Sequence, residues 1–277
     1  MVTDKALKYG HLVAAVIHGS LAIAGFILTS TIFEDKGFVN LTNNPGSGRP
    51  SSEPKEIIIE EEEEDNIIAT YQLPYLVSVF PLLSMINHVY SYTMWDEYNN
   101  TVLKQEYNPV RWGEYSISAG IMLWIIGQLS SISDVGTLIP LTLANVPLQG
   151  LGYLGEKQIG EADTVLTPEQ ETNVYATQMI GFSVFALSWV TIFINFFTVI
   201  AKSESDVPDS IYIIIIAMFT LFLMFGVLSL MNMRRKIAGT EKFKTSSYRN
   251  TEMGYIILSL VSKTLLFTLT FSGGIFV

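Results

Sequence analysis

One lysine stands inside an otherwise apolar stretch, and it is the residue best placed to do chemistry. Lys263 lies in the run YIILSLVSKTLLFTLTF, which contains no acidic residue that could neutralise it. Ionisable residues are costly inside a bilayer, so each one suggests a function. Lys263 could form an ion pair with an acid from another helix. Alternatively, its amine could bond covalently as a Schiff base, because desolvation makes a lysine amine a better nucleophile.

Glu114 is the one carboxylate expected to lie deep enough to balance a charge on Lys263. It occurs in NPVRWGEYSISAGIMLW, three residues after Arg111, so an ion pair between these two at the membrane edge is the structural alternative. A buried cation needs a carboxylate partner, and we expect Glu114 to be that counterion. Ser118 follows Glu114 by one turn and Ser259 precedes Lys263 by one turn, so both hydroxyls could hydrogen-bond the pair.

Two of the three histidines fall within apolar runs. His18 lies in the first run and His88 in the second, and both are expected level with Lys263 or on its N-terminal side. With Glu114 and the two serines they would form one polar cluster, in which a histidine could accept a proton. Each histidine could instead be a hydrogen-bonded packing residue. A zinc site is disfavoured, because the two lack the i, i+4 spacing of a helical metal site.

These residues belong to apolar runs that are long enough to cross a bilayer, at about 20 residues each. Six runs are clear, and a seventh is interrupted by Pro140 and Pro147 but carries no charge. The expected spans are 12–33, 71–95, 112–133, 136–154, 175–201, 211–233 and 255–277. The sequence therefore predicts an all-α membrane protein, a seven-transmembrane helix bundle that residues 1–277 form as a single domain.

The composition agrees with a membrane protein and excludes several other classes. Of 277 residues, 49% are hydrophobic and 15% charged, and the mean hydropathy is +0.37, whereas soluble domains carry about 25% charged residues. The absence of cysteine excludes disulfides and a thiol nucleophile. A net charge of -10 argues against a nucleic-acid partner. No nucleophile–base–orienter set is visible, so no enzymatic activity is expected.

The charge distribution predicts an orientation, because Lys and Arg near span ends prefer the cytoplasmic side. If the chain has seven spans, eleven Lys and Arg residues fall on the same side of the membrane as the N-terminus and four fall on the opposite side. Lys263 lies inside a span. We therefore expect a cytoplasmic N-terminus and an extracellular C-terminus. The first loop, residues 34–70, would then be extracellular and would hold most of the surplus acid. In that loop, residues 57–59 and 67–68 could be the short strands of a hairpin around the solvated acidic run 60–65.

Together these features resemble the microbial rhodopsins, and in particular their heliorhodopsin branch. The similarity rests on the lysine in the seventh span, RWGEYSIS at 111–118, SLVSK at 259–263, the two histidines, the inverted orientation and the long outer loop. It extends over nearly the whole chain. Two features depart from the family: the first loop is unusually acidic, and the sixth span has no tryptophan where ion-pumping rhodopsins usually place one against retinal.

The resemblance implies a photoreceptor that binds all-trans retinal as a Schiff base on Lys263, with Glu114 as its counterion. Light would move the Schiff-base proton toward the polar cluster on the cytoplasmic side. Phe222 or Phe225 would take the place of the missing tryptophan. The resemblance also implies a homodimer in the lipid bilayer with an unknown signalling partner. The residues that it assigns to the retinal site are Lys263, Glu114, His18, His88, Tyr115, Ser118, Ser259, Phe222 and Phe225.

Ion pumping is not expected. Ion-pumping relatives usually carry a carboxylate one turn before the lysine, where this chain has Ser259, and residues 122–126 are apolar where outward proton pumps place a donor. A vectorial relay needs titratable groups on both sides of the Schiff base. One alternative is a light-activated proton-conducting rhodopsin with a path through Gln178, Thr191 or Asn195. Another is a retinal-free transporter or scaffold, in which Lys263 and Glu114 form a structural ion pair.

Overall fold

The computed structural model describes residues 2–43, 67–162, 166–202, 207–234 and 248–272, and most of these are helical. In chain order the elements are α1 (Asp4–Thr31), β1 (Phe38–Thr42), β2 (Ile67–Gln72), α3 (Leu73–Thr93), α4 (Trp95–Tyr98), the π-helical turn η1 (Asn99–Leu103), α5 (Pro109–Leu129), α6 (Val135–Leu143), α7 (Asn145–Gly160), α8 (Pro168–Lys202), α9 (Asp209–Met233) and α10 (Tyr248–Ser272).

The helices confirm the predicted seven-helix membrane bundle. Among the described residues, α1, α3, α8, α9 and α10 are long and apolar enough to cross a membrane. The third span is α5, which is 21 residues long and carries Arg111 and Glu114. The fourth is divided at Ala144 into α6 and α7, with Pro140 inside α6. A proline removes a backbone donor, and this is tolerated in a membrane helix when neighbouring groups satisfy the freed carbonyl.

Two helices begin well before the apolar runs that predicted them. α8 begins at Pro168 with Glu169 and Glu171 in its first turn, where acids stabilise a helix N-terminus. α10 begins at Tyr248, seven residues before the expected start. Its early polar residue Glu252 is only 1% exposed, because other helices rather than lipid or water surround it.

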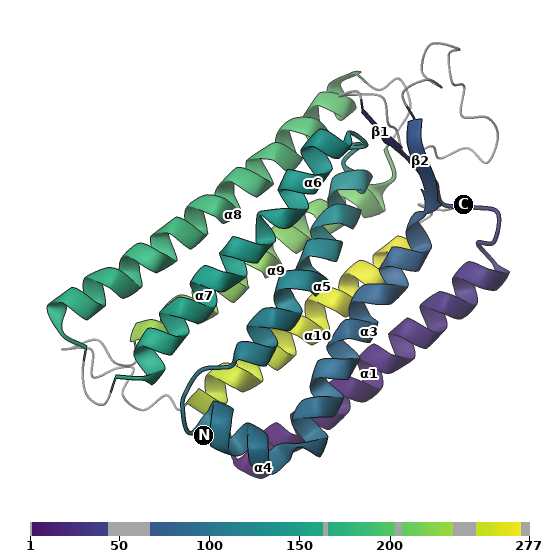
Figure 1. Ribbon diagram of the computed structural model, residues 1–277. Helices are drawn as coiled ribbons and strands as arrows, with labels where there is room; N and C mark the ends of the chain where they lie inside the picture. Colours follow the sequence, from purple (N-terminus) through teal and green to yellow (C-terminus); the bar gives the residue numbers. More distant parts are fainter. Residues whose placement is uncertain (1, 44–66, 163–165, 203–206, 235–247, 273–277) are drawn as a thin grey trace.

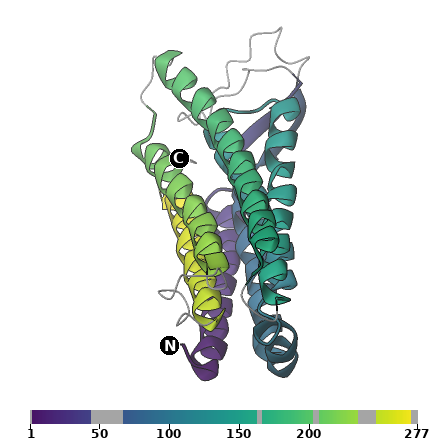
Figure 2. The same ribbon diagram turned by 90° about the vertical axis from the view of Figure 1, so that its left-hand side faces the viewer.

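The helices run side by side along one direction (Figures 1 and 2). The N-terminus and α4 lie at one end of the bundle, and the β1–β2 hairpin lies at the opposite end (Figure 1). α3 packs against α1, α5 and α10, while α7 packs against α5 and α8. α3 therefore brings together the two helices that carry Glu114 and Lys263.

The hairpin prediction is confirmed for residues 67–68, and the observed partner strand is β1. Residues 67–68 do begin a strand, but β2 pairs antiparallel with β1, from Phe38 opposite Gln72 to Thr42 opposite Ile67. The pairing follows from the neighbouring helices: β1 comes shortly after α1, β2 runs directly into α3, and these two helices pack together. Residues 57–59, the strand expected as partner, lie outside the described residues, as does the acidic run 60–65.

Side chains fasten the hairpin to the end of the bundle. The Gln72 amide donates to the carbonyl oxygens of Phe33 at 3.0 Å and Glu34 at 2.6 Å, just after the end of α1. The indole of Trp124 in α5 donates to the hydroxyl of Tyr71. Burial raises the pKa of Tyr71 to about 12, so this hydroxyl stays protonated at neutral pH. The hairpin thus holds the ends of α1, α3 and α5 in fixed relative positions.

Candidate functional site

Lys263 of α10 meets Glu114 of α5 in the interior of the bundle. The Nζ atom donates to Glu114 Oε1 at 3.0 Å, and the two side chains are only 3% and 7% exposed. The alternative of an Arg111–Glu114 pair at the membrane edge is wrong, because Arg111 pairs with other carboxylates. A buried charge without a partner would be strongly destabilising, so each member of the pair holds the other in place.

Two buried serine hydroxyls complete the hydrogen bonding of this pair. Ser259 accepts from Lys263 Nζ at 3.3 Å. Ser84 of α3 accepts from the same Nζ and donates to Glu114 Oε1 at 2.7 Å, so it bridges the cation and the carboxylate. The sequence analysis missed Ser84. The available signal was its position four residues before His88, which places both on one face of a helix.

The histidines form a cluster between α1 and α3. The rings of His18 and His88 are stacked, with centroids 5.5 Å apart and an interplanar angle of 4°. His11 was not expected to belong here, but its Nδ1 lies 3.0 Å from Nδ1 of His88 and shares a hydrogen bond with it. All three side chains are buried. The missed signal was the spacing of His11 and His18, which are seven residues apart and therefore on one face of α1.

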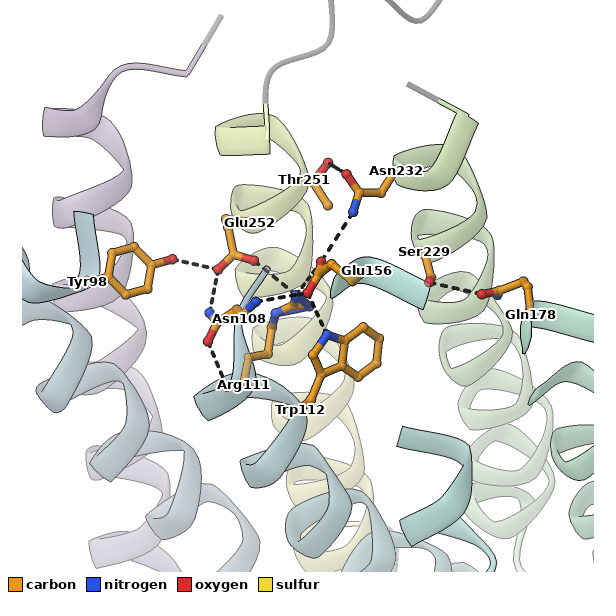
Figure 3. A network of polar contacts seen from close by, with 10 residues as sticks. All are labelled: Tyr98, Asn108, Arg111, Trp112, Glu156, Gln178, Ser229, Asn232, Thr251 and Glu252. Carbon is orange, nitrogen blue, oxygen red and sulfur yellow. Dashed lines mark hydrogen bonds and ion pairs between the residues drawn. The ribbon is translucent and has the colours of Figure 1, made fainter. Parts of the chain in front are cut away.

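A second charged cluster lies nearer the N-terminal end of the bundle (Figure 3). Arg111 Nη2 donates to both carboxylate oxygens of Glu156 at 2.7 Å and lies 3.2 Å from Glu252 Oε1. Trp112 Nε1 also donates to Glu156, at 2.6 Å. Glu156 and Glu252 are each 1% exposed. The expectation that Glu114 is the only deep carboxylate is therefore wrong.

Polar groups from other helices satisfy the remaining oxygens of this cluster. Tyr98 donates its hydroxyl to Glu252 Oε2 at 2.6 Å, and Asn108 Nδ2 donates to the same oxygen at 2.8 Å. Asn232 of α9 donates to Glu156 Oε1 at 3.3 Å. In the sequence, both glutamates stand just outside apolar runs and look like interfacial charges. Only the packing of α4, α5, α7, α9 and α10 shows that they converge (Figure 3).

A cavity of about 790 Å³, counting the part that opens outward, begins at Lys263 and extends between α5, α7, α8 and α9. Of the expected site residues, Lys263, Tyr115, Ser118, Phe222 and Phe225 line it. The Tyr115 ring lies 5.1 Å from Lys263 Nζ, within the range of a cation–π contact. The other expected site residues, Glu114, Ser259, His18 and His88, are not among the lining residues.

Small residues leave room for the aromatic side chains around this cavity. A Cβ atom on Gly152 would lie 2.5 Å from the ring of Trp112, and one on Gly226 would lie 2.8 Å from the ring of Phe182. The sixth span lacks a tryptophan, but Trp189 of α8 packs edge-on against Phe222 with centroids 5.9 Å apart. The cavity therefore has the concave, mostly apolar and aromatic wall that suits a rigid hydrophobic ligand.

The polar groups are distributed unevenly along the bundle. The histidines and the Arg111 cluster lie toward the N-terminal end from Lys263, whereas the helices beyond it enclose a large apolar cluster. That cluster includes Phe80, Ile125, Trp189, Ile214 and Leu266. Asp134, the buried carboxylate in the described part beyond this cluster, lies at the hairpin end, where it accepts from Thr137. Within the described residues, buried titratable groups are thus concentrated on one side of Lys263.

A membrane bundle of seven helices, with a buried lysine–carboxylate pair beside an aromatic cavity, defines the rhodopsin class of membrane proteins. The family model described as Heliorhodopsin matches residues 7–275, which is almost the whole chain. The chain therefore belongs to the heliorhodopsin family. Membership supports a light-sensing integral membrane protein with a retinal chromophore. No curated protein sequence matches this chain.

Solved structures of other rhodopsins share the fold. The crystal structure of Exiguobacterium sibiricum rhodopsin matches with a TM-score of 0.63 and 12% identity, covering 99% of this chain and 97% of that chain. The transmembrane domain of Salpingoeca rosetta rhodopsin phosphodiesterase matches with a TM-score of 0.63 and 10% identity, covering 98% and 84%. A second structure of that protein, which includes the linker region, matches with a TM-score of 0.62 and 11% identity. It covers 97% of this chain and 71% of that chain. At such low identity the likeness concerns the fold alone.

The Arg111 cluster makes a prediction about stability. Arg111→Gln leaves the carboxylates of Glu156 and Glu252 buried without their guanidinium partner, which should lower the free energy of unfolding by about 3–5 kcal/mol. Unfolding of the purified protein in detergent, followed by circular dichroism, measures the loss. The matched control is the double variant Arg111→Gln/Glu156→Gln, which removes one of the stranded charges and should recover part of the stability. A double variant less stable than the single one would contradict this account of the cluster.

Proposed function

We propose that this chain is a light-sensing photoreceptor that carries all-trans retinal as a Schiff base on Lys263, with Glu114 as the single counterion. The observation that carries the proposal is the buried Lys263–Glu114 pair, 3.0 Å apart, at the wall of an aromatic cavity. When bound, retinal supplies the absorption of visible light and the isomerisation of a double bond. The protein supplies the attachment point, the cavity and the charges around it.

The residues around the cavity fit this ligand. Tyr115, Phe222 and Phe225 offer flat apolar surfaces that would restrict the orientation of a polyene. The Ser118 hydroxyl is fully buried and has no hydrogen-bond partner among the described residues, so it can turn toward a group in the cavity. Lys263 has its amine at the same wall, where covalent attachment would fill the space that the cavity provides.

Glu114, Ser84 and Ser259 hold the charge on the lysine nitrogen in the dark. One carboxylate balances one cation, and the two hydroxyls fix the direction of the nitrogen's hydrogen bonds. Such preorganised polar contacts keep a buried cation protonated. Lys263 and Glu114 together are neutral, so this region of the bundle carries no uncompensated charge before light is absorbed.

His18 and His88 would receive the proton that leaves the lysine nitrogen after light is absorbed. Both are buried, and the charge of Lys263 acts on both. Neither ring nitrogen of His18 has a hydrogen-bond partner within the described residues, so a lone pair is available there. Proton movement would therefore run toward the N-terminal end of the bundle, which the 11-to-4 distribution of Lys and Arg assigns to the cytoplasm.

The remaining features of the proposal concern assembly. We infer that residues 1–277 act as one retinal-binding membrane domain with a cytoplasmic N-terminus, an extracellular C-terminus and an extracellular loop at 34–70. The family resemblance favours a homodimer that passes its signal to a partner protein and has no enzymatic activity of its own. A pull-down with the protein in the dark and in light would identify that partner.

Transport of ions does not belong to the proposed function, because the apolar cluster beyond Lys263 offers no relay. Of the residues considered for a conducting path, Asn195 Nδ2 donates to the Thr191 carbonyl oxygen and the Thr191 hydroxyl donates to Leu187 O, both within α8. Gln178 lines the cavity and donates to the Gly226 carbonyl oxygen at 3.3 Å. These contacts satisfy the side chains locally and favour the sensor over the proton-conducting alternative.

The attachment of retinal is the first prediction of this function. Protein purified after incubation with all-trans retinal should show an absorption band in the visible range, because a protonated Schiff base absorbs there and free retinal does not. Lys263→Ala should lose the band while keeping its helical circular dichroism. A wild-type protein that folds but shows no visible band would favour a retinal-free membrane protein instead.

The counterion makes a second prediction. Glu114→Gln should move the visible band to longer wavelength, or replace it with the band of the unprotonated form at neutral pH, because the compensating negative charge is gone. Glu156→Gln is the matched control, since it removes a buried carboxylate that is bonded to Arg111 rather than to Lys263. Equal spectra for wild type and Glu114→Gln would refute the counterion assignment.

The absence of transport is a third prediction. Voltage-clamped cells that express the pigment should show no sustained photocurrent at any holding potential, because the described part of the chain has an apolar cluster, and no proton relay, between Lys263 and the hairpin end. An outward proton-pumping rhodopsin, expressed in the same cells, serves as the positive control. A sustained, voltage-dependent proton current would favour the light-activated conducting rhodopsin.

A further inference from the structure

Within the described residues, the Arg111 cluster has one carboxylate more than it has cations. Arg111 is the guanidinium that faces Glu156 and Glu252, so the three groups together carry one negative charge when both acids are ionised. Glu156 receives hydrogen bonds from Arg111, Trp112, Asn232 and the backbone N–H of Asn108. Glu252 has the longer contact to Arg111, at 3.2 Å, and its Oε2 accepts from the Tyr98 hydroxyl at 2.6 Å.

A separate observation connects Glu252 to the histidines. His11 is 3% exposed, and its Nε2 has no hydrogen-bond partner among the described residues. Its ring meets the ring of Tyr98 edge-on, with centroids 4.9 Å apart. Tyr98 in turn donates its hydroxyl to Glu252 Oε2 at 2.6 Å. The buried His11 imidazole, whose Nε2 has no hydrogen-bond partner among the described residues, is therefore separated from Glu252 by the Tyr98 side chain.

The His11 imidazole also contacts the pair formed by His18 and His88. His11 Nδ1 and His88 Nδ1 are 3.0 Å apart, and the ring of His88 is stacked on that of His18. The charge of Lys263 acts on both His18 and His88. A succession of titratable side chains thus leads from the His18–His88 pair through His11 and Tyr98 to the surplus carboxylate.

We infer that Glu252, held between Tyr98, Asn108 and Arg111, is a buried proton-binding site and that His11 connects it with the His18–His88 pair. The inference rests on the proposed function for the origin of the proton, but the site itself exists without retinal. It extends the path of the proton beyond the two histidines and gives it a destination inside the protein.

The transfer along this path is balanced at every step. His88 gains a proton on the side of Lys263 and gives its Nδ1 proton to Nδ1 of His11. His11 releases the proton on its Nε2 toward the Tyr98 hydroxyl, which passes its own proton to Glu252 Oε2 along their hydrogen bond. Each ring and the tyrosine end neutral, and the cluster around Arg111 changes from a net charge of -1 to zero.

Several charged or titratable groups face Glu252. From α5 and α7 these are Arg111 and Glu156, from α4 it is Tyr98, and from α1 it is His11. Tyr248 and Tyr255 belong to the same helix as Glu252. Arg111 and Glu156 are the charged members of this set, and both belong to the cluster that holds Glu252.

The site is tested first without retinal. Infrared spectra of the retinal-free full chain in lipid nanodiscs, recorded from alkaline to acidic pH in H2O and D2O, should show the carbonyl band of a protonated carboxylic acid that is lost in Glu252→Gln. Glu156→Gln should keep this band, because the group that takes the proton is Glu252. A band unchanged in Glu252→Gln, or one that is lost in Glu156→Gln, would overturn the site.

The connection is tested with the pigment. Light-minus-dark infrared spectra should show the same carbonyl band in the wild type and lose it in both Glu252→Gln and His11→Phe. His11→Phe keeps an aromatic ring against Tyr98 and should retain the retinal-free titration. A light-induced band that persists in His11→Phe would overturn the role of His11. Failure to form any pigment would count against the proposed function only, since the titration of the retinal-free protein still decides the site.

Discussion

A positive charge in the middle of a bilayer needs a partner, and this requirement governs the arrangement of the central helices. Lys263 on α10 is compensated by Glu114 on α5, and the two are bridged by Ser84 on α3. No two of these helices alone would satisfy both charges and their hydrogen bonds. The packing of α3 against both α5 and α10 therefore determines which groups surround the Lys263 amine. It also fixes the position of this amine at the wall of the cavity.

The second organising feature is the contrast between the two halves of the bundle. Toward the N-terminal end lie two groups of titratable side chains: the histidines of α1 and α3, and the Arg111 cluster, whose hydrogen bonds join α4, α5, α7, α9 and α10. Toward the hairpin end, apolar side chains fill the interior around Phe80 and Trp189. This contrast supports the proposal that light moves a proton within the protein, whereas transport across the membrane would need a comparable relay through the apolar half.

The seven spans could be predicted from the sequence, because runs of about 20 apolar residues are long enough to reveal a membrane helix. Lys263 and Glu114 could also be found, since each is an isolated charge in such a run. The convergence of Glu156 and Glu252 could not, because both stand beyond the ends of apolar runs and resemble surface charges. His11 was missed for the same reason. The partner of β2 depends on how α1 packs against α3, which local strand signals do not contain.

The central claim is that light acts on a protonated Schiff base formed by Lys263. The most direct measurement is the resonance Raman spectrum of the pigment prepared with unlabelled or 15N-labelled lysine, in H2O and in D2O. The account predicts a carbon–nitrogen stretching band that moves to lower frequency with the label and again in D2O, since the nitrogen belongs to lysine and carries a proton. A pigment whose band is unaffected by labelled lysine, or that shows the carbonyl band of free retinal instead, would contradict it.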